Sequence, residues 1–290
     1  MFVAAVTMAA ACDISIGAAE FSVREEKKFA VTGPTQLTLS TFDGSIEVRG
    51  WDRNEVLVEV EKRGPDQATV DKIQVNASQN GNTITLEVSK PSPLTATSFQ
   101  RSPSASLVVS VPLQSAITAR SGDGSITIRR VNGNVDLDTD DGSVRVENVK
   151  GDLIVRTGDG SVRAREIDGR AKVNTGDGSI GIDGVFKGLQ VETRDGSIEV
   201  TARAGSAIES EWSVTTGDGS IRMEVPEGFS ADLDAQSADG RVRVDKLTDQ
   251  DPVPAAREDD ERGSARGRLG AGGKPLKLRS GSGSITIKNW

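Results

Sequence analysis

The feature that most constrains this chain is a short turn sequence that recurs at a fixed interval. The turn reads Asp-Gly-Ser at Asp43, Asp123, Asp141, Asp159, Asp177, Asp195 and Asp218. Two variants follow, Asp239-Gly240-Arg241 and Ser282-Gly283-Ser284. The five turns from Asp123 to Asp195 lie 18 residues apart without slippage. A fixed short period is typical of proteins built from stacked repeats.

One repeat, residues 141–158, indicates what each unit contains. Val144 and Val146 alternate with charged residues after the turn, and Leu153 and Val155 do the same after a corner at Gly151. Alternation with period two predicts half-buried strands. Aliphatic residues recur in other copies three and five residues after the turn Asp, and four and six before it. We therefore expect an all-β fold: a parallel β-solenoid of about nine 18-residue coils with two strands per coil.

An antiparallel meander of hairpins is the second interpretation, because it would also give short strands joined by glycine turns. It would not require strict 18-residue phasing.

The repeat is interrupted twice. Residues 50–116 are expected to form an N-terminal cap or decorated coil, with a short helix near 66–72 and a hairpin at Asn80-Gly81. Residues 248–274, rich in charge, Pro and Gly, are expected to form a disordered insertion. The last repeat, residues 276–287, is then expected to close the stack.

The N-terminal segment indicates export. Residues 1–11 carry no charge, are mostly apolar and end in three alanines, as in a signal peptide. Cys12, the only cysteine, then resembles the lipid-attachment residue of a bacterial lipoprotein. There are two alternatives. The signal peptide is cleaved after Ala19, or the chain is cytoplasmic and merely begins with apolar residues. We expect a linker at 12–28, a single solenoid domain at 29–290, and a membrane-anchored lipoprotein on a periplasmic or surface face, or else a soluble secreted protein.

Composition narrows the function classes. A net charge of −8 disfavours nucleic-acid binding, which needs a basic surface. The chain has no His, no cysteine other than Cys12 and no Gly-Lys-Ser/Thr loop. Acyl transfer and nucleotide hydrolysis therefore lack their usual groups. Paired acids on a β-helix could cleave polysaccharides, but only three Trp and seven Phe are present as platforms for sugar rings. We expect no catalytic residues and no cofactor.

The repeated aspartates are the remaining candidates for chemistry. Stacked coils would place Asp123, Asp141, Asp159, Asp177 and Asp195 in a ladder about 4.8 Å apart. Calcium-binding β-rolls also use 18-residue coils, but here half of the expected oxygen ligands are missing. We therefore favour structural Asx-type turns with Gly at a positive φ, and the aligned Thr residues as hydroxyl ladders. The residues assigned to these turns are Asp43, Gly44, Gly124, Gly142, Gly160, Gly178, Gly196, Asp218 and Gly219.

The Thr-Gly-Asp-Gly-Ser-Ile repeat, with Val/Ile-x-Gly at the opposite corner, resembles the bacterial putative-adhesin domain family of unknown function. The segment from Phe42 to Val48, followed by Gly50-Trp51-Asp52, looks like the first coil of that family. The resemblance implies a β-helix-like fold and brings no catalytic residues. Together with the export signal, it leads us to expect a non-enzymatic, adhesin-like module of the cell envelope whose strand faces bind protein or glycan partners. The alternative is a structural or stress-sensing envelope protein that contacts signalling partners.

Overall fold

The computed structural model of the chain describes residues 14–17, 20–90, 102–209, 211–245 and 263–289. Two compact units are present, Met1–Gly142 and Ser143–Trp290, so the single domain expected at 29–290 contains both. The predicted signal segment 1–11 and Cys12 lie outside the described residues. Within the described ranges, no helix is long and apolar enough to cross a membrane.

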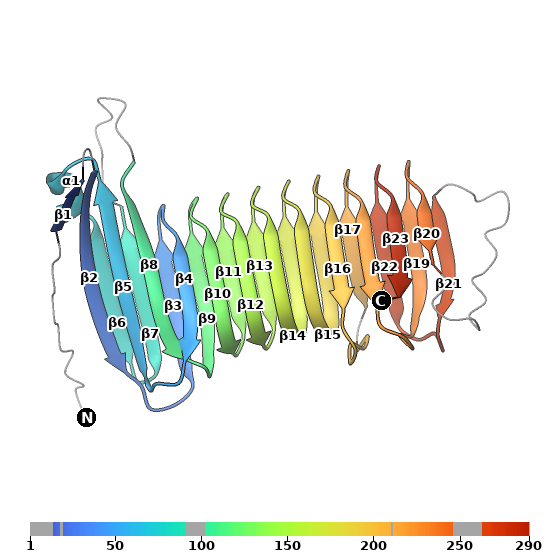
Figure 1. The fold of residues 1–290 in the computed structure, drawn as a ribbon, viewed down its shortest axis with the longest axis horizontal. Helices are drawn as coiled ribbons and strands as arrows, with labels where there is room; N and C mark the ends of the chain where they lie inside the picture. The colour runs from blue at the N-terminus through green and yellow to red at the C-terminus, as the bar shows by residue number, and fades with distance from the viewer. Residues whose placement is uncertain (1–13, 18–19, 91–101, 210, 246–262, 290) are drawn as a thin grey trace. The chain divides into compact units, whose positions relative to one another are not determined.

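The first unit is built almost entirely of strands (Figure 1). Its elements are β1 (Ile14–Gly17), β2 (Glu20–Ala30), β3 (Thr35–Thr41), β4 (Ile46–Trp51), β5 (Glu55–Gly64), α1 (Gln67–Asp71), β6 (Gln74–Asn80), β7 (Thr83–Ser89), β8 (Ser104–Pro112), β9 (Ser115–Ser121), β10 (Ile126–Asn132) and β11 (Val135–Thr139). Strand β2 includes much of the segment expected to be a linker. The short helix and the hairpin at Asn80-Gly81 are both confirmed: the Asp66 side chain caps α1 at the backbone N–H of Thr69, and β6 pairs antiparallel with β7.

The first Asp-Gly-Ser turn lies inside this unit rather than at its end. Strand β3 pairs in parallel with β7 on one side and with β9 on the other. Strand β4 lies likewise between β8 and β10. The segment that interrupts the repeat thus supplies β7, which pairs with β3, and β8, which pairs with β4. Strand β5 then pairs antiparallel with β8, and β2 pairs antiparallel with β5. Charged residues such as Arg24, Glu26 and Lys28 in β2 are typical of strands near a sheet edge.

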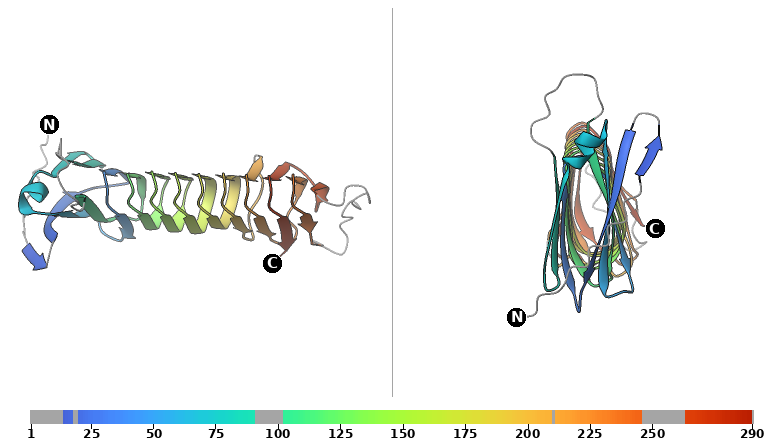
Figure 2. Two further views of the ribbon diagram at one scale, coloured as in Figure 1. Left: turned by 90° about the horizontal axis from the view of Figure 1, so that it is seen from above. Right: turned by 90° about the vertical axis from the view of Figure 1, so that its left-hand side faces the viewer.

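The second unit contains the regular repeats. Its strands are β12 (Val144–Lys150), β13 (Leu153–Thr157), β14 (Val162–Thr175), β15 (Ile180–Thr193), β16 (Ile198–Ala202), β17 (Trp212–Thr216), β18 (Ile221–Val225), β19 (Ala231–Ser237), β20 (Val242–Val244), β21 (Ser264–Leu269), β22 (Pro275–Ser280) and β23 (Ile285–Asn289). Val144 pairs with Val162, and Val162 with Ile180, so equivalent residues of adjacent repeats are in parallel register. Figure 2 shows the successive corners of these repeats aligned.

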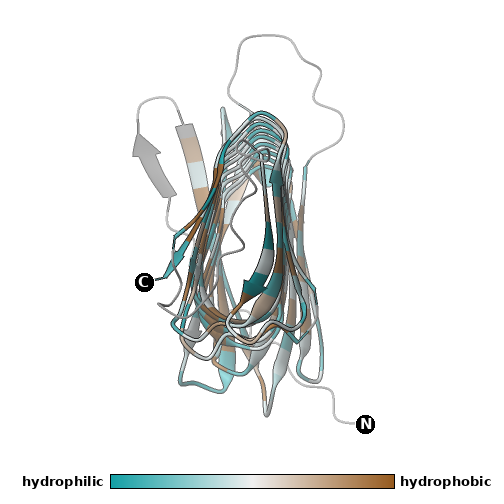
Figure 3. Cartoon of the chain, turned by 90° about the vertical axis from the view of Figure 1, so that its right-hand side faces the viewer, coloured by the Kyte–Doolittle hydropathy of each residue, from teal (hydrophilic) through white to brown (hydrophobic). Residues whose placement is uncertain are grey.

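The aliphatic positions of the repeat form the core. In the repeat that begins at Asp141, Val144, Val146, Leu153 and Val155 are all buried. The equivalent residues of the other repeats are buried too, except Val242 and Val244 in the short strand β20, which are partly exposed. Hydrophobic and hydrophilic colours alternate along the strands in Figure 3. Trp212 is the largest of these core residues, and its ring lies edge-on to Phe186 with the centroids 6.2 Å apart.

The last repeat does not close the second unit. Strand β22 lies between β17 and β19, and β23 lies between β18 and β20. The outermost strand is β21, which pairs antiparallel with β19. Residues 264–269 were expected to belong to a disordered insertion, whereas the structure shows a strand there; residues 248–262 lie outside the described ranges.

The predicted fold class is therefore wrong. The protein is all-β, but its strands pair in both parallel and antiparallel orientation, and it is not a parallel solenoid of nine equivalent two-strand coils. Antiparallel pairs, β1–β2, β2–β5, β5–β8, β6–β7 and β19–β21, contradict the uniform pattern. Strands β14 and β15 also run through the corner as single 14-residue strands, because bulges between Ala164 and Ile167 and between Gly169 and Arg170 absorb the bend.

Asp234 in β19 fastens the strands at this end of the second unit to one another. Its carboxylate accepts hydrogen bonds from Arg266 of β21 at 3.1 Å and from Arg279 of β22 at 2.5 Å. Gln236 donates a further bond at 3.0 Å. Burial works to raise the pKa of Asp234, but the hydrogen bonds from Arg279, Arg266 and Gln236 outweigh it and lower the pKa below its ordinary value.

Asp234→Asn is expected to destabilise the second unit by about 1–2 kcal/mol near neutral pH, because charge-assisted hydrogen bonds to two strands are lost. Since the folded-state pKa is lowered, this stabilisation is present above the unfolded pKa and disappears as the pH falls through the folded value. Urea unfolding of wild type and variant at several pH values would measure the difference. Asp239→Asn, at an exposed turn position, is the matched control. A gap between wild type and Asp234→Asn that stays constant down to strongly acidic pH would contradict the assignment.

Candidate functional site

The predicted turn residues form a ladder along one edge of the repeats. Two residues before each turn stands a buried Thr or Ser, and several of these hydroxyls bond to two successive turns. Thr193 Oγ1 accepts a hydrogen bond from the Gly196 N–H at 3.2 Å and donates one to the Gly178 carbonyl of the preceding turn at 2.9 Å. The same double contact occurs at Ser121, Thr139, Thr216, Ser237 and Ser280. Each hydroxyl therefore links one turn to the next.

The turn glycines are required because the turns approach one another closely. A Cβ atom on Gly196 would lie 2.1 Å from the carbonyl oxygen of Gly178. Added Cβ atoms at other turn glycines would meet backbone at similar distances: 2.0 Å at Gly44, 1.9 Å at Gly124, 2.2 Å at Gly142, 2.2 Å at Gly178 and 1.9 Å at Gly219. Gly160 belongs to the same series, since its N–H donates to Thr157 and its carbonyl accepts from Thr175.

The structure corrects the expected turn type. Positive φ values occur in the described residues at corner glycines such as Gly151 and Gly169, and not at the glycines of the Asp-Gly-Ser turns. The hydroxyl, not the Asp carboxylate, accepts the turn N–H. These turns are consequently not Asx turns with Gly at a positive φ, whereas the predicted hydroxyl ladder is present.

Three of the turn aspartates contact other side chains. Asp177 accepts a bond from Arg194 at 2.5 Å, Asp218 from Ser282 at 2.8 Å, and Asp43 lies 3.5 Å from Lys90. Within the described ranges, no group of three or more His, Cys, Asp or Glu side chains is arranged so that it could hold a metal ion. The weak calcium candidates Asp123, Asp141, Asp159, Asp177 and Asp195 are not brought together in such a group.

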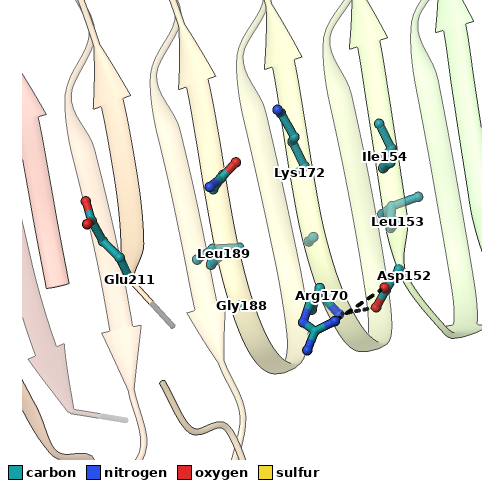
Figure 4. A pocket seen from close by; sticks show the side chains of 10 residues that line it. Asp152, Leu153, Ile154, Arg170, Lys172, Gly188, Leu189 and Glu211 are labelled. Carbon is teal, nitrogen blue, oxygen red and sulfur yellow. Dashed lines mark hydrogen bonds and ion pairs between the residues drawn. The ribbon is translucent and has the colours of Figure 1, made fainter. Parts of the chain in front are cut away.

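A notch of about 250 Å³ lies on the outer face of β13, β14, β15 and β17 in the second unit (Figure 4). Its floor is the backbone around Leu153, Ala171 and Leu189, whose side chains are buried in the core. Polar side chains line its walls: Asp152, Arg170, Lys172, Gln190 and Glu211. Gly188 pairs with Arg170 across the strands and provides no side chain, so a hollow remains between Arg170 and Glu211.

Most charged side chains of the notch form ion pairs, which restrict the orientation of these side chains. The Arg170 side chain lies 3.9 Å from Asp152 and 3.8 Å from Glu209, and its backbone N–H donates to Asp152 at 3.2 Å. Glu211 forms an ion pair with Lys277 at 2.9 Å. Lys172 is exposed and has no ion-pair partner among the described residues. An ammonium group, an amide and a half-exposed Ile154 can therefore contact a small polar ligand.

The segment before β17 borders this notch. The N–H groups of Ala207 and Glu209 donate to the carbonyls of Phe186 and Lys187 in β15, at 3.0 and 3.1 Å. Arg203 is fixed to Asp183 through a charged hydrogen bond of 2.9 Å. These contacts hold residues 203–209 against the sheet beside the notch, at the β15 bulge where Lys187 has no cross-strand partner.

Sequence analysis did not find the notch. Seven residues before the turn Asp, the successive repeats carry Asp152, Arg170, Gly188 and Glu211. One glycine in an outward-facing column of charged residues was the available signal. It could not be interpreted without knowing that this column faces outward, because glycine also marks corners and bulges.

Comparison with known proteins gives a family and several fold relatives. Residues 34–288 match the model of a family described as Toastrack DUF4097. Comparison with curated proteins finds no match.

Three of the similar solved structures come from Clostridium sporogenes, Bacteroides fragilis and Parabacteroides distasonis. A "putative cell adhesion protein" from Clostridium sporogenes is 14% identical, with 92% of this chain and 100% of that chain covered and a TM-score of 0.31. A "putative adhesin" from Bacteroides fragilis is 14% identical over 92% and 97%, with a TM-score of 0.39. A "putative lipid binding protein" from Parabacteroides distasonis is 16% identical over 92% and 96%, with a TM-score of 0.49. At such values these matches carry no argument about function.

Gly196→Ala is expected to destabilise the second unit by about 1–3 kcal/mol or more, because the added methyl group would collide with the backbone of the preceding turn. Gly181→Ala is the matched control within the same repeats, since nothing lies within 4 Å of its Cβ position. It should be neutral or stabilise by about 0.5–1 kcal/mol. Urea unfolding followed by circular dichroism would compare them; equal effects of the two substitutions would refute the close-approach explanation.

Proposed function

The chain belongs to the Toastrack DUF4097 family, and from this membership and its surface we propose that it is a non-enzymatic, adhesin-like interaction module of the bacterial cell envelope. It binds envelope or extracellular proteins or glycans through the outer faces of its strands. The notch on β13, β14, β15 and β17 is the contact point that we assign to this role.

The notch is the observation that supports this proposal. Its walls combine the cation of Lys172 and the amide of Gln190, on the paired strands β14 and β15, with carboxylates directly before β13 and β17. Preorganised polar groups on a rigid sheet bind a ligand with little loss of side-chain and backbone entropy. Sugar hydroxyls and peptide amides match such donors and acceptors.

Binding without chemistry agrees with the residues at hand. The chain has no His, and its only cysteine lies in the N-terminal segment. Arg170 and Glu211 in the notch are tied to ion-pair partners, which orient both side chains for contact with a ligand. We therefore propose recognition as the role of the notch.

We also propose that the protein is exported and carried on a membrane by a lipid on Cys12. The apolar residues before Cys12 and the small residues that end at Ala11 support this location. A lipid anchor with a rigid β-structure attached would present the strand faces to the periplasm or to the cell exterior.

Replacing Lys172 and Gln190 together by Ala is expected to weaken ligand binding about tenfold, because both polar contacts of the notch are lost. The assay immobilises the protein and measures binding of a panel of purified envelope and extracellular glycans and proteins. Asn174→Ala with Glu192→Ala is the matched control, since these exposed residues lie two positions further along the same strands.

Absence of binding across the panel would overturn the proposed function, as would release of new reducing ends from a bound glycan. Binding that both double variants weaken equally would remove the notch from the proposal. Binding confined to inner-membrane signalling proteins would favour the structural or sensing alternative.

Cys12→Ser is expected to abolish incorporation of a clickable fatty acid in cells and to move the protein from the membrane to the soluble fraction, because a stable anchor requires covalent lipid. Gel fluorescence of labelled cells and membrane fractionation measure both effects. Ala11→Ser, beside the attachment position, is the control for expression and export. Undiminished labelling of Cys12→Ser would contradict lipid attachment at Cys12.

A further inference from the structure

Three arginine side chains lie together on the outer face of β12 and the first half of β14, before the bend of β14 that leads to the notch residues Arg170 and Lys172. Arg145 of β12 pairs directly with Arg163 of β14. Arg165 is two residues further along β14, so it projects from the same face. All three are exposed. Adjacent strands are about 4.8 Å apart, which places three positive charges within reach of one small anion.

These arginines differ from several others of the second unit in lacking an ion-pair partner among the described residues. Arg194, Arg203 and Arg279 are each bound to an aspartate of the same unit at 2.5 Å. Arg145, Arg163 and Arg165 have no ion pair or side-chain hydrogen bond within the described part of the chain. Arg145 and Arg163 lie directly opposite each other, and like charges in that position repel, whereas Arg165 lies opposite Glu147. A bound anion would relieve the repulsion between Arg145 and Arg163.

Space for a ligand exists beside the cluster. Arg163 pairs on its other side with Gly181, which has no side chain, and nothing lies within 4 Å of its Cβ position. The next residue in this row is Glu199. The open position next to Arg163 thus admits a ligand, and Glu199 limits the basic area on that side.

We infer that Arg145, Arg163 and Arg165 bind a carboxylate or sulfate group of an acidic polysaccharide. This inference names a partner class for the proposed envelope function and rests on it. Guanidinium groups present paired N–H donors that match the two oxygens of such groups. Ser143 and Ser161, at the equivalent exposed turn positions before Arg145 and Arg163, supply hydroxyls for neighbouring sugar atoms.

A polysaccharide fits this face better than a membrane surface. Among the described residues, the large exposed hydrophobic side chain is Val108, which lies in the first unit and not beside the arginines. The face therefore offers polar contacts and no apolar group to insert between lipids.

The test measures binding of polygalacturonate, as a carboxylate polymer, and dextran sulfate to the purified full chain. Neutral dextran and vesicles with and without anionic phospholipid are measured in parallel. The variant replaces Arg145, Arg163 and Arg165 by Gln. The matched control replaces Arg222, Arg243 and Arg268 by Gln, which changes the net charge equally but at exposed positions on three separate strands.

Wild type is expected to bind at least one anionic polymer and not neutral dextran, with affinity falling as salt rises from about 50 to about 500 mM. The cluster variant should lose about tenfold in affinity and the control less than about twofold. Equal losses in both variants, no binding of either polymer, or a preference for anionic vesicles would each overturn the inference. The notch proposal is tested separately, because Lys172 and Gln190 are unchanged in both variants.

Discussion

The contact between one Asp-Gly-Ser turn and the next is the constraint on which the repeats depend. The turn glycine lets two backbones approach to a distance that no Cβ atom permits, and the buried hydroxyl two residues before the Asp bridges the same two turns. A buried hydroxyl without partners would be costly, so satisfaction of both its hydrogen bonds selects a single register. With that register set, the aliphatic columns superimpose and the outward-facing residues form straight rows. The notch and the arginine cluster are both products of this alignment.

The sequence predicts the repeated part of this fold well and its ends poorly. The 18-residue interval and the columns containing Val144 and Leu153 indicate which side chains are buried and which residues pair. They say nothing of what covers the first and last repeats, because an inner strand and an end strand share the same alternation. The antiparallel strands β2, β5 and β21 were therefore not predicted, and the uniform parallel solenoid was wrong.

The turn chemistry shows a second limit. Asp-Gly-Ser is a common signature of an Asx turn, and an Asp carboxylate competes well for backbone N–H groups in isolated turns. Here the hydroxyl of Thr193, or of its equivalent in another repeat, already accepts the hydrogen bond from the turn N–H. The carboxylates are left to contact other side chains, as Asp177 contacts Arg194. The notch escaped prediction for a related reason. Gly188 becomes informative only when its neighbours in space, Arg170 and Glu211, are known.

The position of β22 and β23 has a consequence for how the polypeptide is assembled. These strands follow β19 and β20 in the chain, yet they lie between β17/β18 and β19/β20. A ribosome or a translocon that delivers the chain from its N-terminus cannot complete this part of the second unit one strand after another. Strands β19 and β20 cannot reach their final positions until β22 and β23 emerge. The synthesis of β22 and β23 thus governs when the second unit acquires its full cooperativity.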